Sequence, residues 1–435
     1  MNDQSSPASP DEVLPASPLA IPDYRRFWIA RCGSVFATSG MVVVLGYQLY
    51  DLARGTYGMS VRAAAFQLGI LGLVQFLPQV LFAPIAGVVA DRNDRRAVAA
   101  LFTAIDVFVA LALTVLTATA TLTLPLLFVL AAAHGTVRTF IGPAQSSIAP
   151  NVVPGPLMPR AVAISAMSWQ IGSVAGPALA GILFGFYPAL PHALATVLLA
   201  ASAISLSRIR PVPPSPGAAR VHPLRQMTDG LVYVAKDRFL LGCVTLDLFA
   251  VLLGGATALL PVYARDILTW HGVPVGADGL GVMRAMPSLG AAAIGLVIAR
   301  RPIAREVGAR MLLAVGAYGL ATVGFGLSRH FLLSLVFLAA LGAADMVSVF
   351  IRNTLVQLHT PDALRGRVSA VSGLAISASN ELGEMESGVA AALLGPTGAV
   401  VFGGIGAVVV TVLWTLRFPE LRRTRTFARD YAPSP

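Results

Sequence analysis

The sequence predicts an all-α integral membrane protein with twelve transmembrane helices, on the basis of its composition and of the spacing of its apolar segments. Hydrophobic residues make up 56% of the 435 residues and charged residues 12%, whereas soluble proteins carry about 25% charged residues. At about 20 residues per span, a chain of this length has room for about twelve spans. The net charge of +10 does not indicate nucleic-acid binding, because the basic residues recur between apolar segments and form no continuous patch.

The first helical hairpin is the clearest element. Residues 63–87 carry no charge and run into a short basic turn, and residues 97–124 then carry a single acid. Two membrane helices joined by such a turn form a hairpin with its turn in the cytoplasm. Continued along the chain, the same reading predicts these spans: 27–51, 63–88, 97–118, 121–145, 161–186, 190–207, 239–264, 278–300, 309–328, 331–357, 367–394 and 397–417.

The basic residues determine the expected orientation. An even number of spans puts both chain ends on one side, and that side holds most of the arginines. The opposite side carries only Arg54, Arg62, Arg265 and Arg329. By the positive-inside rule both termini are cytoplasmic. Residues 1–22 are expected to be a disordered cytoplasmic tail and residues 418–435 a second tail, in a multi-pass protein of a bacterial inner membrane.

A polar, proline-rich segment at 208–238 is expected to link two six-helix bundles, 23–207 and 239–417, on the cytoplasmic side. Short motifs recur between the two bundles. Arg26-Phe27 returns as Arg238-Phe239, and Gly87-Val88-Val89 returns as Gly295-Leu296-Val297. Similar spacing throughout indicates two parallel repeats related by an axis along the membrane normal.

The turn between the second and third spans has the pattern G-x-x-x-D-R-x-x-R-R, formed by Gly87, Asp91, Arg92, Arg95 and Arg96. This pattern resembles the loop signature of the major facilitator superfamily of transporters. The resemblance implies the twelve-helix major facilitator fold and a role for these five residues as a conformational latch. Asp91 is expected to meet the N-terminus of the eleventh span in the outward-facing state, where the helix dipole favours an anion.

Two further motifs lie in the fourth and fifth spans. Arg138-Thr139-Phe140-Ile141-Gly142 resembles the fourth-helix signature R-x-x-Q-G of the superfamily, with Ile141 in place of Gln. The fifth span resembles the antiporter signature G-x-x-x-G-P-x-x-G-G, with Ala180 in place of one glycine. Its matching residues are Gly172, Gly176, Pro177 and Gly181. They predict close helix packing and a stiff or kinked point, and they favour export.

Buried charges recur in every third span. Spans 1, 4, 7 and 10 carry them, and in the facilitator fold these helices line the central cavity. Because a charge in hydrocarbon needs a partner or a polar cavity, the candidate cavity and substrate-binding residues are Arg31, His134, Arg138, Asp247 and Arg352. Asp345 and Arg352 share one face of the tenth span, and each is expected to meet a partner on another helix.

The eleventh span carries the densest acidic cluster. Glu381 and Glu384 share a face near mid-membrane, and two carboxylates this close should not both be ionised. We expect this pair to carry the coupling proton, preferentially on Glu384, with Asp345 as the alternative carrier. The competing interpretation is that these acids only neutralise Arg31, Arg138 or Arg284.

Within the superfamily, the chain resembles the group of bacterial exporters that includes the enterobactin exporter and macrolide efflux proteins, over about residues 22–420. The resemblance rests on residues 24–31, on the loop signature at 87–96 and on residues 353–368, which contain a Pro-Asp-x-x-Arg-Gly-Arg turn. It implies proton-driven export of a small molecule, a siderophore or an amphipathic drug, by alternating access. A proton-coupled importer of a siderophore or nutrient on the same fold is the alternative.

Other classes of function find no support in the sequence. It shows no nucleophile–base pair, no cluster of metal ligands and no G-x-x-x-x-G-K-S/T nucleotide loop. We therefore expect no enzyme activity, no cofactor and no metal ion. The expected partners are the lipid bilayer, a small-molecule substrate and protons, and the protein is expected to be a monomer.

Overall fold

The computed structural model describes residue 15, residues 17–212 and residues 223–427, and these are almost entirely helical. Eleven helices in this part of the chain are long and apolar enough to cross a membrane. The last contains two crossings, because Gly395 leaves the helical conformation with φ 80° and ψ 162°. The described chain therefore crosses twelve times, as predicted. Residues 1–14, 213–222 and 428–435 of the predicted tails and linker lie outside the described residues.

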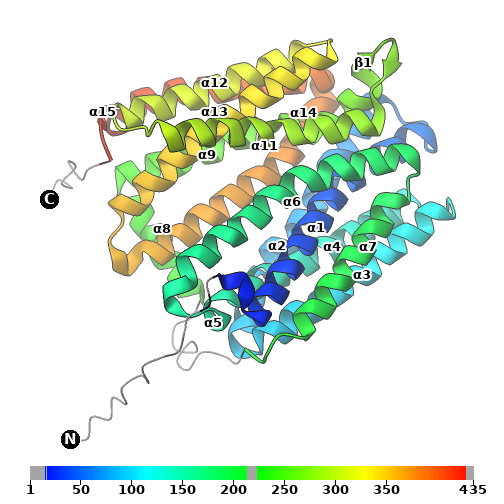
Figure 1. The fold of residues 1–435 in the computed structure, drawn as a ribbon. Coiled ribbons are helices and arrows are strands. Elements are labelled where there is room, and N and C mark those ends of the chain that lie inside the picture. The colour runs from blue at the N-terminus through cyan, green and yellow to red at the C-terminus, as the bar shows by residue number, and fades with distance from the viewer. Residues whose placement is uncertain (1–14, 16, 213–222, 428–435) are drawn as a thin grey trace, which may run out of the picture.

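The first half is a bundle of six long helices, drawn from blue to green in Figure 1. They are α1 (Pro22–Gly55), α2 (Val61–Arg92), α3 (Arg95–Ala118), α4 (Leu124–Ser146), α6 (Met158–Phe186) and α7 (Leu190–Ser207). Short elements lie at their ends: η1 (Pro18–Ala20), α5 (Ala149–Val152) and η2 (Gly155–Leu157). Local sequence fixes several starts. Ser60 and Asp94, for example, accept hydrogen bonds from backbone N–H groups in the first turns of α2 and α3.

The second half repeats this arrangement, drawn from green to red in Figure 1. Its long helices are α9 (Arg238–Leu253), α11 (Gly276–Arg300), α12 (Val307–Leu327), α13 (Phe331–His359) and α14 (Asp362–Arg417), the last being divided at Gly395. Shorter elements are α8 (Pro223–Lys236), η4 (Ala256–Leu259), α10 (Leu260–Val262), η5 (Tyr263–Ile267), β1 (Thr269–Trp270), β2 (Val273–Pro274) and α15 (Pro419–Arg423). The two strands pair antiparallel as a small hairpin.

Helix α8 is an element that the sequence analysis did not anticipate within the predicted linker. It packs beside α14, and its Asp229 accepts a hydrogen bond from Arg367 at 3.2 Å. Gly230 lies against the backbone of Arg367, where an added Cβ would come within 2.9 Å of the carbonyl oxygen. The second part of the linker is therefore a helix attached to the second half.

The seventh crossing differs from the continuous span predicted at 239–264. Helix α9 ends at Leu253, and the chain continues through the short elements η4, α10 and η5. Gly254 and Gly255 stand at the break, where glycine has little helix propensity and allows neighbouring helices to approach. An added Cβ on Gly255 would lie 2.6 Å from Ser387 Oγ.

Hydrophobic packing differs between the two ends of the molecule. One cluster of buried residues belongs to both halves and includes Leu45 and Leu71 of the first half with Leu260 and Leu280 of the second. Two other clusters each belong to one half, one around Phe27, Ile148 and Leu206 and the other around Phe239, Ile351 and Leu421. The halves therefore share a core at the end that carries the β1–β2 hairpin, and each has its own core at the end where α5 and α8 lie (Figure 1).

Two helix crossings join the halves, α2 with α14 and α6 with α11. Both are built on glycine pairs. A Cβ on Gly388 would lie 2.5 Å from the Cα of Gly69, and a Cβ on Gly181 would lie 2.7 Å from the Cα of Gly281. Because real Cβ atoms do not approach so closely, only glycine permits these backbone contacts.

Candidate functional site

The break in the seventh crossing gathers polar side chains from three helices of the second half. Three carbonyl oxygens around it accept side-chain hydrogen bonds: Gly254 from Tyr318 at 2.9 Å, Gly255 from Ser387 at 3.1 Å and Thr257 from Arg284 at 3.1 Å. A broken helix at membrane depth persists where its freed backbone groups are bonded in this way. Such interrupted helices commonly mark substrate and ion sites in transporters.

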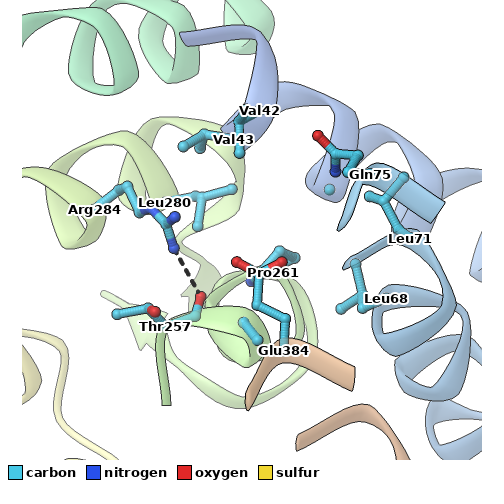
Figure 2. A pocket seen from close by; sticks show the side chains of 12 residues that line it. Val42, Val43, Leu68, Leu71, Gln75, Thr257, Pro261, Leu280, Arg284 and Glu384 are labelled. Atoms are coloured by element: carbon cyan, nitrogen blue, oxygen red, sulfur yellow. Dashed lines mark hydrogen bonds between the residues drawn. The ribbon is translucent and has the colours of Figure 1, made fainter. Parts of the chain in front are cut away.

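A small cavity of about 40 Å³ opens beside this break, between α1, α2, α11 and α14. Figure 2 shows Arg284, Glu384 and Gln75 around it, with apolar side chains such as Leu68 and Leu71 completing the wall. Among the described residues, Gln75 Oε1 makes no hydrogen bond. A space of this size holds a few water molecules at about 10–15 Å³ each. In this conformation it is suited to water and protons.

Glu381 and Glu384 lie together at this boundary, as the sequence predicted from their spacing. Arg138 of the first half and Arg284 of the second interact electrostatically with both carboxylates. Gly72 of α2 makes the approach possible, since an added Cβ there would lie 2.8 Å from Glu384 Cβ. The two glutamates thus interact with an arginine of each half, so a change in their charge affects both halves.

Two other predicted residues lie apart from the glutamates. Asp345 on α13 interacts with Tyr318, and within the described part of the chain it forms no ion pair. Arg31 on α1 is partly buried near Tyr24, and its Nε has no hydrogen-bond partner among the described residues. Neither residue is part of the small cavity.

His134 lies inside the first bundle and away from the small cavity, so its role as a cavity residue stays a prediction. Its side chain has no exposed surface, and its Nδ1 lies 2.7 Å from Oδ1 of Asp106, which is equally buried. The physical reason is that Asp106 on α3 offers a carboxylate inside the first bundle. The sequence analysis had treated His134 without this partner.

Asp247 and Arg352 form a buried ion pair between α9 and α13, with side-chain exposures of 9% and 4%. Arg352 therefore meets a partner on another helix, as expected from its position in the tenth span. The pair is largely closed to solvent, however, and its charges are satisfied within the second half. This arrangement favours a packing role over direct substrate binding in this conformation.

The predicted latch residues lie at the end where α5 and α8 are found. Asp91 is 49% exposed, and its carboxylate is 3.7 Å from Arg95 in the same half. Arg92 is exposed, and an added Cβ on Gly87 would meet no atom within 4 Å. These contacts are within the first half, so the latch between the halves stays a prediction about another conformation.

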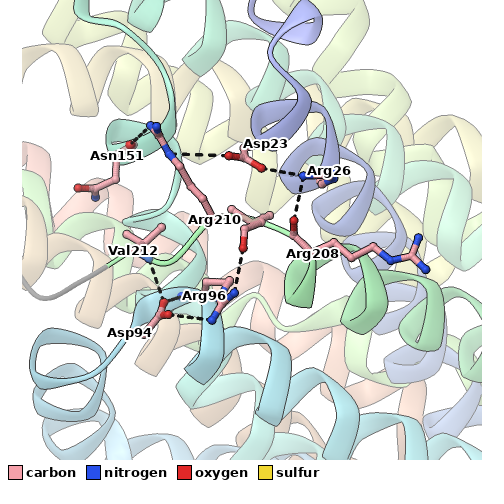
Figure 3. A network of polar contacts seen from close by, with 9 residues as sticks. Asp23, Arg26, Asp94, Arg96, Asn151, Arg208, Arg210 and Val212 are labelled. Carbon is pink, nitrogen blue, oxygen red and sulfur yellow. Dashed lines mark hydrogen bonds and ion pairs between the residues drawn. The ribbon is translucent and has the colours of Figure 1, made fainter.

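Arg96 has a contact that the signature did not suggest. Its guanidinium lies 3.1 Å from Asp94 and donates to the carbonyl oxygen of Ile209 at 3.0 Å. Asp94 in turn accepts from the backbone N–H of Val212 at 3.2 Å. Figure 3 shows these contacts beside those of Asp23, Arg26 and Arg210. The network attaches the start of the linker to the first half.

The antiporter-like motif of α6 packs against two helices. Gly172 and Gly176 lie against α1, where a Cβ on Gly176 would come within 2.6 Å of the carbonyl oxygen of Phe36. Gly181 lies against α11 across the boundary between the halves, and Pro177 is buried between these contacts. The close packing predicted from the small residues is thus present, and it includes the other half.

The sequence analysis missed a polar cluster that joins the halves at the opposite end. Asp51 pairs with Arg265 at 3.1 Å, and Arg54 pairs with Asp266 at 3.2 Å, to which Tyr50 also donates a hydrogen bond. Each half contributes one acid and one arginine. Arg265 and Asp266 sit in the π-helical turn η5, a rare form that redirects side chains and that no spacing rule could reveal.

Comparison with known proteins agrees with this architecture. The profile of transmembrane secretion effectors matches residues 14–435. The chain belongs to this family of the major facilitator superfamily. Membership makes it a membrane transporter and not an enzyme.

Relatives and solved structures extend the comparison. The chain is 27% identical to the enterobactin exporter EntS of Citrobacter koseri over 411 residues, with 93% of this chain and 94% of that protein covered. It is 25% identical to EntS of an Escherichia coli strain over 407 residues, with the same coverage. A bacterial homologue of the lysosomal transporter Spinster, in an inward-facing occupied conformation, gives a TM-score of 0.71 at 14% identity, covering 94% of this chain and all of that one. The nucleoside transporter NupG gives 0.70 at 13% identity, covering 91% and 100%.

Proposed function

We propose that the protein is a proton-coupled exporter of a small molecule, a siderophore or an amphipathic drug, and that it works by alternating access in a bacterial inner membrane. The glutamate pair of α14 carries the argument. Glu381 and Glu384 sit where the halves meet, facing Arg138 from one half and Arg284 from the other. A proton that joins or leaves this pair changes the attraction between the halves.

The coupling follows from charge balance. When both glutamates are ionised, they attract the two arginines and draw the halves together around the site. An ionised glutamate can also accept a hydrogen bond from a donor or cationic group of the substrate, and a proton on that carboxylate removes the acceptor. Substrate and proton then compete for the same carboxylates, which is what exchange of one for the other requires. We assign the proton to Glu384, because it lines the cavity beside Gly72.

Export is the direction favoured by two observations. The antiporter-like motif of α6 packs as its signature predicts, and the curated relatives are named as exporters. With both termini in the cytoplasm, as the basic residues indicate, the closed end with Asp51 and Arg265 is the external one. The described conformation then faces the cytoplasm, ready to receive substrate.

Gradient-driven transport by purified protein tests this proposal. In proteoliposomes with an imposed pH gradient, Glu384→Gln should abolish uphill transport of enterobactin or ethidium and leave downhill exchange intact, because Gln cannot release a proton. The matched control is Glu386→Gln, two residues along the same helix, which should keep both activities. Uphill transport that survives in both Glu381→Gln and Glu384→Gln would remove the pair from the coupling mechanism and leave Asp345 as the candidate.

The same assay separates the exporter from the importer. A proton-coupled exporter moves substrate into the acidic compartment, because protons leave that compartment as substrate enters it. A proton-coupled importer moves substrate and protons in the same direction, out of the acidic compartment. Symport in this assay would show that the protein is an importer. The role of Glu384 is tested separately, by the Glu384→Gln variant.

A further inference from the structure

Four helices of the first bundle bury two hydrogen-bonded groups of polar side chains that the transport site does not use. Asp106 on α3 and His134 on α4 have no exposed surface and lie 2.7 Å apart, Oδ1 to Nδ1. His192 on α7 is equally buried, and its Nε2 lies 2.8 Å from Gln48 Oε1 on α1. Gln48 donates from Nε2 to Thr117 Oγ1 at 2.8 Å.

Hydrogen-bonding rules determine which atoms of Gln48, Thr117 and His192 donate and which accept. Because the amide nitrogen of Gln48 donates to Thr117, its oxygen faces His192 and must accept. The Nε2 of His192 therefore carries the hydrogen, and its Nδ1 is left as an acceptor if the ring is neutral. This assignment follows from the network of bonded partners.

Three buried atoms of these side chains have no hydrogen-bond partner among the described residues: Asp106 Oδ2, His134 Nε2 and His192 Nδ1. Buried polar atoms are almost always bonded, so these atoms point to small polar ligands such as protons or water molecules.

Charge balance requires a proton on the pair of Asp106 and His134. In the described part of the protein, Asp106 forms an ion pair with no arginine or lysine. Beside His134, α2 contributes the uncharged backbone of Gln75 against Gly135. Arg138 lies one turn beyond His134 but interacts with the glutamates of α14. An ionised carboxylate beside a neutral imidazole would be an uncompensated charge, which is costly away from water.

We propose that the first bundle contains a proton-binding site of its own, in which Asp106 and His134 share one proton. The added proton balances the carboxylate, and the ring of His134 then carries a hydrogen on Nε2, which a buried water molecule can accept. The site is separate from the glutamate pair. The two are connected by α4, which carries His134 and Arg138 one turn apart.

The protonation state can be observed directly, without a substrate or a gradient, so the result is independent of the proposed transport function. The full-length protein is labelled with ¹⁵N-histidine and ¹³C-aspartate and placed in vesicles of phosphatidylethanolamine and phosphatidylglycerol. Magic-angle-spinning NMR at about pH 7.5, where free histidine is mostly neutral, reports both partners. We expect either both ring nitrogens of His134 or the carboxyl of Asp106 to carry the shared proton. A neutral His134 beside an ionised Asp106 would overturn the proposal.

His134→Gln assigns the signals by their loss, and His330→Gln, which removes an exposed histidine, is the matched control. If His134→Gln does not fold, a second sample labelled with ¹³C-alanine and ¹⁵N-histidine assigns the wild-type signal through the correlation from Ala133 to His134, the one Ala-His pair in the sequence. Asp106→Asn should leave His134 with a single ring proton.

Discussion

The two ends of the molecule are held together in different ways. At the end with the β1–β2 hairpin, the halves share a hydrophobic core, and reciprocal ion pairs join Asp51 to Arg265 and Arg54 to Asp266. At the end with α5 and α8, each half has its own core, and the ion pairs described there lie within a half, such as Arg238 with Glu420. Opening the hairpin end must therefore break contacts that opening the other end does not.

A large side chain at one of the glycine crossings should have the largest effect on the conformation and on transport. Gly388→Leu places a side chain where even a Cβ would meet Gly69 at 2.5 Å, and overpacking of this kind costs about 1–3 kcal/mol. We expect the hairpin end to open and transport to fall by about tenfold or more. Spin-label distances across that end and transport in proteoliposomes measure both effects. Gly373→Leu on the same helix, where a Cβ meets nothing within 4 Å, should behave like the wild type.

Charge reversal at the reciprocal pairs should have an intermediate effect. Arg265→Asp sets two acids opposite each other, and a partly exposed pair of this kind contributes about 1 kcal/mol or less. We expect a shift of up to about fivefold toward the open hairpin end, seen in the same spin-label distances. The double variant Asp51→Arg with Arg265→Asp should recover the wild-type distribution. The control Arg62→Asp should behave like the wild type. If it does and the double variant still does not recover the wild-type distances, the pair does not join the halves.

Contacts within a half should affect stability and leave the balance between the ends unchanged. Asp94→Ala removes the N-cap of α3 and the acceptor for the N–H of Val212, and loss of such a cap costs about 1 kcal/mol. Thermal unfolding should show the loss, and spin-label distances should not move. A changed distance would show that the start of the linker helps to set the conformation.

The smallest effect on the described conformation is expected for Asp91→Asn. Its carboxylate is half-exposed, and among the described residues its ion pair is with Arg95 at the long distance of 3.7 Å, so stability should hardly change. If Asp91 latches the halves in the opposite state, transport should still fall while substrate binding in detergent is kept. Equal loss of binding and transport would contradict the latch.

Regular features of the fold were predictable from the sequence. The twelve crossings follow from apolar length, and the break between the last two was predicted where Gly395 and Pro396 stand, since glycine and proline interrupt a helix by local chemistry alone. The break after Leu253 was not predicted, because its flanking residues are as apolar as a continuous span and its carbonyls depend on Tyr318 and Ser387 from distant helices.

The candidate site was predictable only where the partners share a helix. Glu381 and Glu384 are one turn apart, so their proximity follows from helix geometry. The partner of His134 was missed because Asp106 is 28 residues away, and no pattern in either span indicates which helix each side chain faces. Side chains that meet across helices depend on packing, which a single sequence does not encode locally.

The positions of the glycine crossings also bear on how the two halves arose. Gly69 and Gly281 lie in the second helix of their respective halves, and Gly181 and Gly388 lie in the fifth. Each crossing thus joins a second helix to a fifth helix of the other half. Two copies of a single six-helix ancestor, related by a twofold axis, would form both crossings at once as an isologous dimer. In such a dimer the interface is self-complementary, so a fused chain would need only the connecting residues 208–238.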